Sequence, residues 1–443
     1  MRDLLVAFIV IACLPVILFR PDIGVMVWTW LGLMNPHRLS WGFALEFPFA
    51  QVVAIATFSG MVLSRKWKFP PVTAETAILA IFVLWTVCTT LFALNPFDAW
   101  DELTRFLKIQ LMVLVSLMVI RTREQLRTLI WVIACSLGFF GVKGGLFTIL
   151  SGGEYLVLGP PDTFIGGNNE LALALVMTIP LMRYLQLTTP NRWSKHGLLL
   201  AIVLTSIAIL GTHSRGGVLG IIAMLASMMW RSRYRVGLAL LLCILIPVSL
   251  SLMPPNWFDR MDTIRDYRSD ASATGRINAW FFAFNLAVDR PVIGGGFNCF
   301  TPELFQKYAP DPADFHDAHS IYFEVLGEHG FVGLWLFLCL ALSVSWSCSR
   351  LIQRARLNPE LSEIEHLGRM IQVSLVAYAV SGAFLGLAYF DLVYTLVAAV
   401  VIAKTLLSAA GDLTVDVGYV EMSPSTIRPR PRLGPSGSRS LRR

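Results

Sequence analysis

Apolar runs recur along the chain from its first residues to about residue 407, and one long polar interval, residues 254–330, interrupts them. A bilayer core roughly 30 Å thick is crossed by about 20 consecutive apolar residues in a helix, which matches these runs. Strands of a membrane barrel would instead alternate apolar and polar residues over about ten positions. The pattern therefore predicts an all-α polytopic integral membrane protein of about twelve transmembrane helices.

The polar interval divides the predicted helices into two sets. We expect transmembrane helices 1–10 within residues 1–253, a periplasmic loop domain carrying the catalytic residues over 254–330, and helices 11 and 12 within 331–408. Residues 409–443, rich in Pro, Ser and Arg, are expected to form a basic and disordered cytoplasmic tail. Pro21 disfavours one continuous helix near the start of the chain, so the first 36 residues form either one span and a half-span or two spans.

Lysine and arginine gather in alternate connections between the apolar runs. Cytoplasmic loops of membrane proteins carry the excess of these residues, so the basic connections are expected on the cytoplasmic side. The polar interval, residues 151–168 and the corner at residues 212–215 then face the periplasm, and an even number of spans places the N-terminus in the cytoplasm. The basic connections are residues 65–68, 121–127, 192–195, 231–235 and 350–369.

Composition argues against a nucleic-acid partner and against a structural disulfide. The net charge of +7 could suggest nucleic-acid binding, but the cations follow the alternation of a membrane topology, so we expect no nucleic-acid partner. Six of the seven cysteines lie in or beside apolar runs and only Cys299 lies in the polar interval, so no structural disulfide is expected. The first apolar run shows no clear cleavage site and is expected to be retained.

The first candidate site is the glycine-rich corner Gly211–Gly217, between two apolar runs, which contains Arg215. A cation at this depth is costly unless it has a partner. Arg215 could simply extend to phospholipid head groups. The surrounding glycines favour a binding site instead, because they allow helices and a ligand to approach closely.

The second candidate lies in the polar interval, where Arg276 opens an amphipathic stretch that predicts a helix on the membrane surface. Arg265 and two neighbouring arginines upstream either add guanidinium groups to the site or pair with adjacent aspartates. The stretch Pro291–Gly296 contains three consecutive glycines, but it lacks the strand and the spacing of a nucleotide-binding loop, so a turn is expected.

The third candidate is a histidine pair, His316 and His319, followed by Glu324 and Glu328. A helix that starts near residue 318 would place His319 on one face and the two glutamates on another. Two histidines without further ligands give poor support to a zinc site. A histidine that titrates near neutrality suits general-base catalysis better.

Arginines beside a histidine at the outer membrane face fit one class of substrate. A guanidinium group can donate two parallel hydrogen bonds to the oxygens of a phosphate. A diphosphate carried on a lipid would approach such groups from the bilayer at this depth. If the diphosphate is the leaving group, arginines can stabilise its developing charge without a metal ion. The histidine could remove the proton of an acceptor hydroxyl, which describes glycosyl transfer from a polyprenyl-diphosphate donor.

At these residues the chain resembles the O-antigen ligase/polymerase family of integral membrane enzymes, and the resemblance covers most of the chain. Where this family often has His-Asn, the chain has His319-Ser320. The stretches that carry the resemblance are Gly167–Ala172, Thr212–Gly217, Gly275–Trp280 with the turn Pro291–Gly296, and Ala318–Gly330.

The resemblance implies a metal-independent glycosyltransferase without a cofactor, in the inner membrane of a bacterium, with its active site facing the periplasm. Its partners would be an undecaprenyl-diphosphate-linked glycan, an acceptor that is lipid A-core or protein, and membrane lipids. The residues implied are His319 as the catalytic base, Arg215, Arg276 and Arg265 at the diphosphate, and Asn169, His316 and Glu324 in support.

Three alternatives stay open from the sequence. An O-antigen-type polymerase and a protein O-glycosylation ligase would share the donor and differ in the acceptor. A transporter or flippase of lipid-linked sugars would place charged residues near the bilayer midplane and often shows repeated halves. No repeat is visible, and the nearest mid-span ionisable residues are only Lys143, Arg183 and Asp391.

Overall fold

The computed structural model describes residues 1–230 and 271–420, which contain helices and no strand. Eight of the described helices are long and apolar enough to cross a membrane. The prediction of a polytopic helical membrane protein is therefore confirmed, whereas the expected number of twelve spans is not decided. The chain divides into two compact units, Met1–Leu407 and Ser408–Arg443, and the fold below is that of the first unit.

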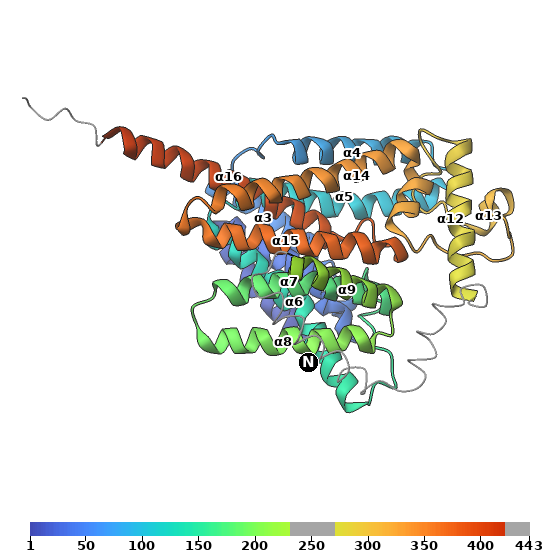
Figure 1. The fold of residues 1–443 in the computed structure, drawn as a ribbon, viewed down its shortest axis with the longest axis horizontal. Coiled ribbons are helices and arrows are strands. Elements are labelled where there is room, and N and C mark those ends of the chain that lie inside the picture. The colour runs from blue at the N-terminus through green and yellow to red at the C-terminus, as the bar shows by residue number, and fades with distance from the viewer. Residues whose placement is uncertain (231–270, 421–443) are drawn as a thin grey trace, which may run out of the picture. The chain divides into compact units, whose positions relative to one another are not determined.

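The helices of the described residues follow one another along the chain as Figure 1 labels them. They are α1 (Arg2–Phe19), α2 (Pro21–Met34), α3 (Phe49–Ser64), α4 (Ala74–Leu91), α5 (Pro96–Val119), α6 (Arg123–Leu150), α7 (Asn168–Thr188), α8 (Arg192–Gly211), α9 (Arg215–Trp230), α12 (Ala271–Asp289), α13 (Pro302–Tyr308), α14 (Ile321–Ala355), α15 (Ser362–Ser381) and α16 (Asp391–Val420). Four short 3-10 turns accompany them: η1 (Pro36–Leu39), η2 (Phe43–Leu45), η3 (Pro359–Leu361) and η4 (Gly382–Phe384).

Residues 2–34 form two helices of 18 and 14 residues, so both alternatives for this segment, one span with a half-span or two spans, stay open. Arg2 at the start of α1 donates to the carbonyl of Leu39, just after α2, and Asp3 accepts from the backbone of Gly42. The chain therefore reverses at Pro21. Arg38, in η1, lies 3.6 Å from Asp162, so the start of α1 lies beside the 151–168 connection. The N-terminus and the 151–168 connection were expected on opposite sides of the membrane, and this expectation is wrong because the two lie at the same end of the bundle.

The basic connections meet one another, as their alternation along the chain requires. Arg121 donates to the carbonyl of Lys68 over 3.0 Å, and Arg123 donates to that of Glu360 over 3.2 Å. Arg127 donates to the carbonyl of Thr188 over 3.1 Å. Four connections that are distant in sequence are thus joined at one end of the bundle, which we call the basic-loop end.

The other end is assembled from connections poor in cations. The backbone N–H of Val157 donates to the carbonyl of Gly211 over 3.0 Å, and the side chain of Asn168 donates to the carbonyl of Thr212 over 2.9 Å. Ser381, at the end of α15, donates to the carbonyl of Gly216 over 3.1 Å. We call this the polar-loop end. The 20 residues of α8 separate it from the basic-loop end.

Helix α12 runs crosswise to α4, α5 and α14 at the polar-loop end, with α13 beside it (Figure 1). Its inner face carries buried Ala279, Phe282 and Leu286 among the residues packed against α13. Its other face leaves Phe281 and Phe284 about half exposed. A helix with one face on protein and aromatic side chains on the other fits the expected position on a membrane surface.

The triple glycine forms the turn that the sequence predicts, and this turn packs into a break in α14. Gly330 has a backbone φ of 67° and ψ of −169°, which interrupts α14. The N–H groups of Gly295 and Gly296 donate to the carbonyls of Gly327 and Glu328, both over 2.8 Å. A Cβ on Gly294 would lie 2.6 Å from the Gly330 nitrogen, so the close approach requires glycine. The turn fixes the orientation of the first part of α14.

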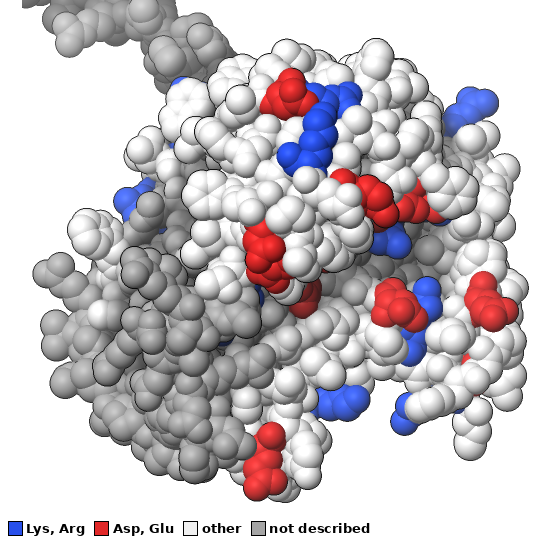
Figure 2. Space-filling model, turned by 90° about the vertical axis from the view of Figure 1, so that its right-hand side faces the viewer, with Lys and Arg blue, Asp and Glu red and all other residues white. Residues whose placement is uncertain are grey.

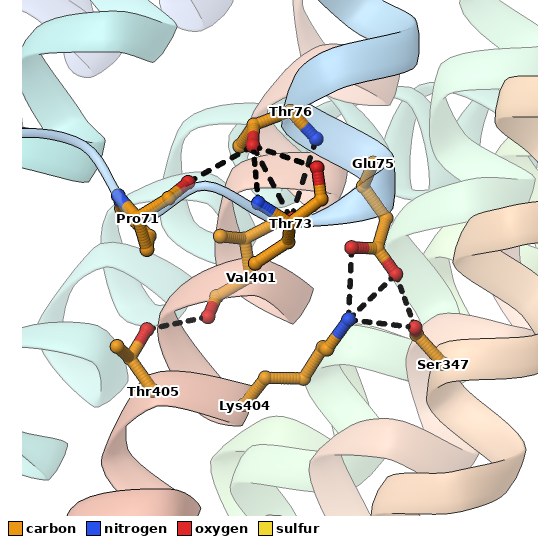
Figure 3. A network of polar contacts seen from close by, with 8 residues as sticks. All are labelled: Pro71, Thr73, Glu75, Thr76, Ser347, Val401, Lys404 and Thr405. Carbon is orange, nitrogen blue, oxygen red and sulfur yellow. Dashed lines mark hydrogen bonds and ion pairs between the residues drawn. The ribbon is translucent and has the colours of Figure 1, made fainter.

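A buried ion pair joins three helices towards the basic-loop end (Figure 3). The Lys404 ammonium of α16 lies 2.8 Å from both carboxylate oxygens of Glu75 in α4, and 3.1 Å from the hydroxyl of Ser347 in α14. Ser347 also donates to Glu75. Glu75 is 1% exposed, and Lys404 supplies the opposite charge that compensates the buried carboxylate.

Helix α16 continues to Val420, past residue 408, where the last span was expected to end. Residues 421–443 lie outside the described residues, and the expected disorder of the tail stays a prediction.

A candidate active site at the polar-loop end

His319 lies just before α14 rather than on it. The helix begins at Ile321, and His319 has a left-handed backbone with φ of 42°, so the expected helix start near residue 318 is wrong. A left-handed residue other than glycine stores strain that the surrounding structure must support. Here the Trp280 indole donates to the carbonyl of Ala318 over 2.9 Å and stacks on Phe323 at 5.1 Å. The α12 tryptophan therefore holds the histidine loop on both sides of His319.

The second histidine, His316, packs on the start of α12. A Cβ built on Gly275 would lie 2.2 Å from the His316 ring, so this glycine makes room for the imidazole. The ring Nε2 lies 2.8 Å from a carboxylate oxygen of Asp314. Asn278 donates to the carbonyls of Asp311 and Asp314 over 2.7 and 2.8 Å. The loop before His319 is thus fixed to the residues that flank Arg276.

Arg276 acts electrostatically on His319. Burial lowers the pKa of the His319 imidazole, the positive charge of Arg276 lowers it further, and Asp317 opposes both effects. An imidazole with a lowered pKa is neutral near pH 7, which is the form that accepts a proton. The arrangement therefore supplies a base next to a guanidinium group.

Arg215 begins α9, and its helix is joined to the His319 loop through residues 382–388. A Cβ on Gly216 would lie 3.4 Å from the Leu385 side chain, and one on Gly386 would lie 3.8 Å from the His319 Cα. The start of α9 and the histidine loop thus contact the same short segment. The structure brings these two motifs together from positions about one hundred residues apart in the chain.

Glu324, one turn into α14, supports that segment. Its carboxylate accepts from the backbone N–H of Ala388 over 3.1 Å. A Cβ on Gly386 would lie 3.5 Å from the same carboxylate. Glu324 thus contacts the same segment as His319, and its supporting role in the site stays a prediction.

The start of α7 contributes acidic and amide groups. Asn169 is half-buried on the first turn, while its neighbour Asn168 makes the bond to Thr212 that ties α7 to the Arg215 corner. Glu170 folds back over Gly167, where a Cβ would lie 2.0 Å from its carboxylate oxygen, and interacts electrostatically with Arg276 and Asp317. Sequence analysis did not single out Asn168, Glu170 or Asp317. The first two lie within the Gly167–Ala172 stretch that carries the resemblance.

Figure 2 shows this end of the molecule, where acidic and basic side chains lie next to each other in several places on a largely uncharged surface. Ser320 is 1% exposed, and its hydroxyl has no hydrogen-bond partner among the residues that the structure describes. Arg265 lies outside the described residues. In the part of the chain that the structure describes, no group of three or more His, Cys, Asp or Glu residues could hold a metal ion.

Two protein families match the chain in comparisons with known sequences. Residues 200–338 match the family described as O-antigen ligase, and this range contains Arg215, Arg276, His316, His319 and Glu324. Residues 1–190, which contain Asn169, match a family of unknown function, DUF5935. No curated protein matches the chain. The first match spans the Arg215, Arg276 and His319 motifs, so this part of the chain is similar to the O-antigen ligase family.

Proposed function

We propose that this protein is a periplasm-facing glycosyltransferase of the O-antigen ligase type, which transfers a glycan from undecaprenyl diphosphate to a hydroxyl of lipid A-core or a similar acceptor. The family match supports the coarser statement, a membrane enzyme of the ligase/polymerase type. The observation that carries the finer proposal is that His319 and the start of α9 both contact residues 385–386, while the charge of Arg276 lowers the pKa of the His319 imidazole.

In the proposed reaction, neutral His319 removes the proton of the acceptor hydroxyl. The acceptor oxygen then forms a bond to the anomeric carbon while the bond from that carbon to the diphosphate oxygen breaks. Undecaprenyl diphosphate leaves with an additional negative charge. Arg215 and Arg276, and Arg265 from the segment outside the described residues, bind this diphosphate, because fixed guanidinium groups stabilise charge that develops in the transition state.

The remaining candidates hold these groups in position rather than react. Glu324 fixes the segment beside His319, His316 packs on the glycine before Arg276, and the first turn of α7 ties the Arg215 corner to the site. A site that assembles from four separate segments needs such supports, since misplacing a reacting group by about 1 Å can reduce the rate roughly a hundredfold.

Transfer of lipid-linked glycan by purified protein, in buffer containing EDTA, tests the proposal. We expect wild-type activity in EDTA and a loss of at least about a hundredfold in kcat for His319→Ala, the usual contribution of a general base. His366→Ala is the matched control, because this histidine is also half-buried but lies in α15, on the side of Arg369 and Glu365. Full activity of His319→Ala would refute the role of the base, and loss of wild-type activity in EDTA would refute the metal-free reaction.

The products of the same assay distinguish the acceptors. A single transfer to lipid A-core is the proposed outcome, whereas repeated addition to a lipid-linked chain would identify a polymerase. Transfer to a protein hydroxyl would identify an O-glycosylation ligase. Movement of the donor across the bilayer without a new glycosidic bond would identify a transporter.

A further inference from the structure

A cation-lined cavity lies between the start of α1, the η1–η2 segment, α6 and the 151–168 connection, and the histidine loop does not line it. Its volume is about 550 Å³, within the usual range for sites that bind small molecules. Its wall contains three cations, Arg2, Arg38 and Lys143, and one carboxylate, Asp162. The charge therefore favours an anion.

The cations come from three elements, α1, η1 and α6, and two of them are held at the wall by separate contacts. Arg2 donates to the carbonyl of Leu39 over 3.2 Å, and Arg38 lies 3.6 Å from Asp162, whose side chain is 80% exposed. Lys143 is exposed on α6, within a helix that is apolar enough to cross a membrane. An ionisable side chain at this position is costly and indicates a functional partner.

The rest of the wall is apolar, and it includes Phe140, Phe147 and Leu158. Phe147 and Leu158 are about half exposed, so the cavity continues onto a hydrophobic surface of the bundle. A free anion would gain nothing from such a surface, whereas a lipid has both a charged head group and chains to place on it.

Aromatic side chains around the cavity match the depth of lipid head groups. Trp41, which lines it, is 90% exposed, and Phe43 and Phe47 of the same segment are about half exposed. Tryptophan and other amphipathic or aromatic groups gather at the boundary between the hydrocarbon core and water. Exposed residues of this kind place the three cations beside the phosphates of the membrane.

We propose that this cavity is a binding site for an anionic glycerophospholipid, with the phosphate held by Arg2, Arg38 and Lys143 and the acyl chains lying along α6. The site does not depend on the proposed glycosyl transfer. Basic pockets between membrane helices bind acidic head groups through the same combination of charge and depth. The bound lipid would join α1, η1 and α6, which are distant in the chain, to the connection that leads to α7.

Native mass spectrometry of the purified full-length protein tests this proposal by titration with phosphatidylglycerol, phosphatidylcholine and inorganic phosphate. We expect the wild type to prefer phosphatidylglycerol. The variant Arg38→Gln/Lys143→Gln should bind it about tenfold or more weakly, because each cation near the surface contributes roughly 1 kcal/mol and 1.4 kcal/mol is tenfold. The variant Arg38→Lys/Lys143→Arg should bind like the wild type.

The matched control is Arg105→Gln/Lys108→Gln, which removes the same charge from exposed positions on α5, outside this cavity. Equal weakening in the control and in Arg38→Gln/Lys143→Gln would overturn the site. Equal binding of phosphatidylcholine, or displacement of the lipid by inorganic phosphate alone, would also overturn it.

Hydrogen exchange of the wild type provides a measurement that does not depend on folding of a variant. With phosphatidylglycerol present, we expect protection at residues 36–45 and 156–162. If the lipid protected only other residues from exchange, or protected none, the proposal would be contradicted.

Discussion

Substitution of Lys404 by methionine isolates a buried carboxylate and should be strongly destabilising. Glu75 is 1% exposed, while the Lys404 side chain is 31% exposed, so the two partners are unequally desolvated. With Lys404 removed, the Glu75 carboxylate keeps neutral partners such as the Ser347 hydroxyl but loses the cation that compensates its charge (Figure 3). Breaking a buried ion pair in this way costs about 3–5 kcal/mol, because one charge is left without compensation.

The reverse substitution should be milder. In Glu75→Gln the Lys404 ammonium loses its carboxylate partner, but its partly exposed side chain can place the charge in water. The new amide oxygen can still accept a hydrogen bond from Ser347. The double variant Glu75→Gln/Lys404→Met removes both charges, and we expect it within about 1 kcal/mol of the wild type, because buried pairs replaced by neutral groups are often near neutral.

Thermal unfolding in detergent, followed by tryptophan fluorescence, measures these differences. We expect the melting temperature of Lys404→Met to fall by at least about 5 °C, given roughly 2 °C per kcal/mol for a large chain. The decisive result is recovery of the wild-type melting temperature in the double variant. If the double variant is as unstable as Lys404→Met, the effect comes from lost packing of the lysine stem, and the electrostatic reasoning is refuted.

Three further predictions concern the active site and the break in α14. Because the neutral His319 imidazole is the proposed base, activity should fall as the pH drops through its pKa. Arg276→Gln removes a charge that lowers this pKa, so the acidic limb of residual kcat/KM should move to higher pH; no movement would contradict the coupling. Asp317→Asn removes a charge that raises it, so the limb should move to lower pH, and a shift in the same direction as Arg276→Gln would refute the assignment. Gly330→Ala should cost at least about 1–3 kcal/mol from its backbone conformation alone, measured by thermal unfolding. The control Gly197→Ala, with nothing within 4 Å of the new Cβ, should be neutral or stabilising, and an equal loss in both would contradict the explanation.

Several local features followed from the sequence because short-range physics decides them. The apolar runs predicted membrane helices, and the alternation of cations predicted which connections would meet. The glycines at 294–296 predicted a turn. The amphipathic stretch after Arg276 predicted α12, whose buried face includes Phe282. Each of these depends on residues within a few turns of one another.

Tertiary structure decided what the sequence left open. The partner of Glu75 lies 329 residues away, so no local pattern could identify Lys404. The helix start near residue 318 was a local prediction, and it failed because Trp280 and the segment at Gly386 hold His319 in a left-handed conformation. Periodicity and charge along the chain thus determined the helices and their grouping. Which distant side chains share a low-dielectric site was decided by packing, because the interaction energy depends on distances in space that a linear sequence does not specify.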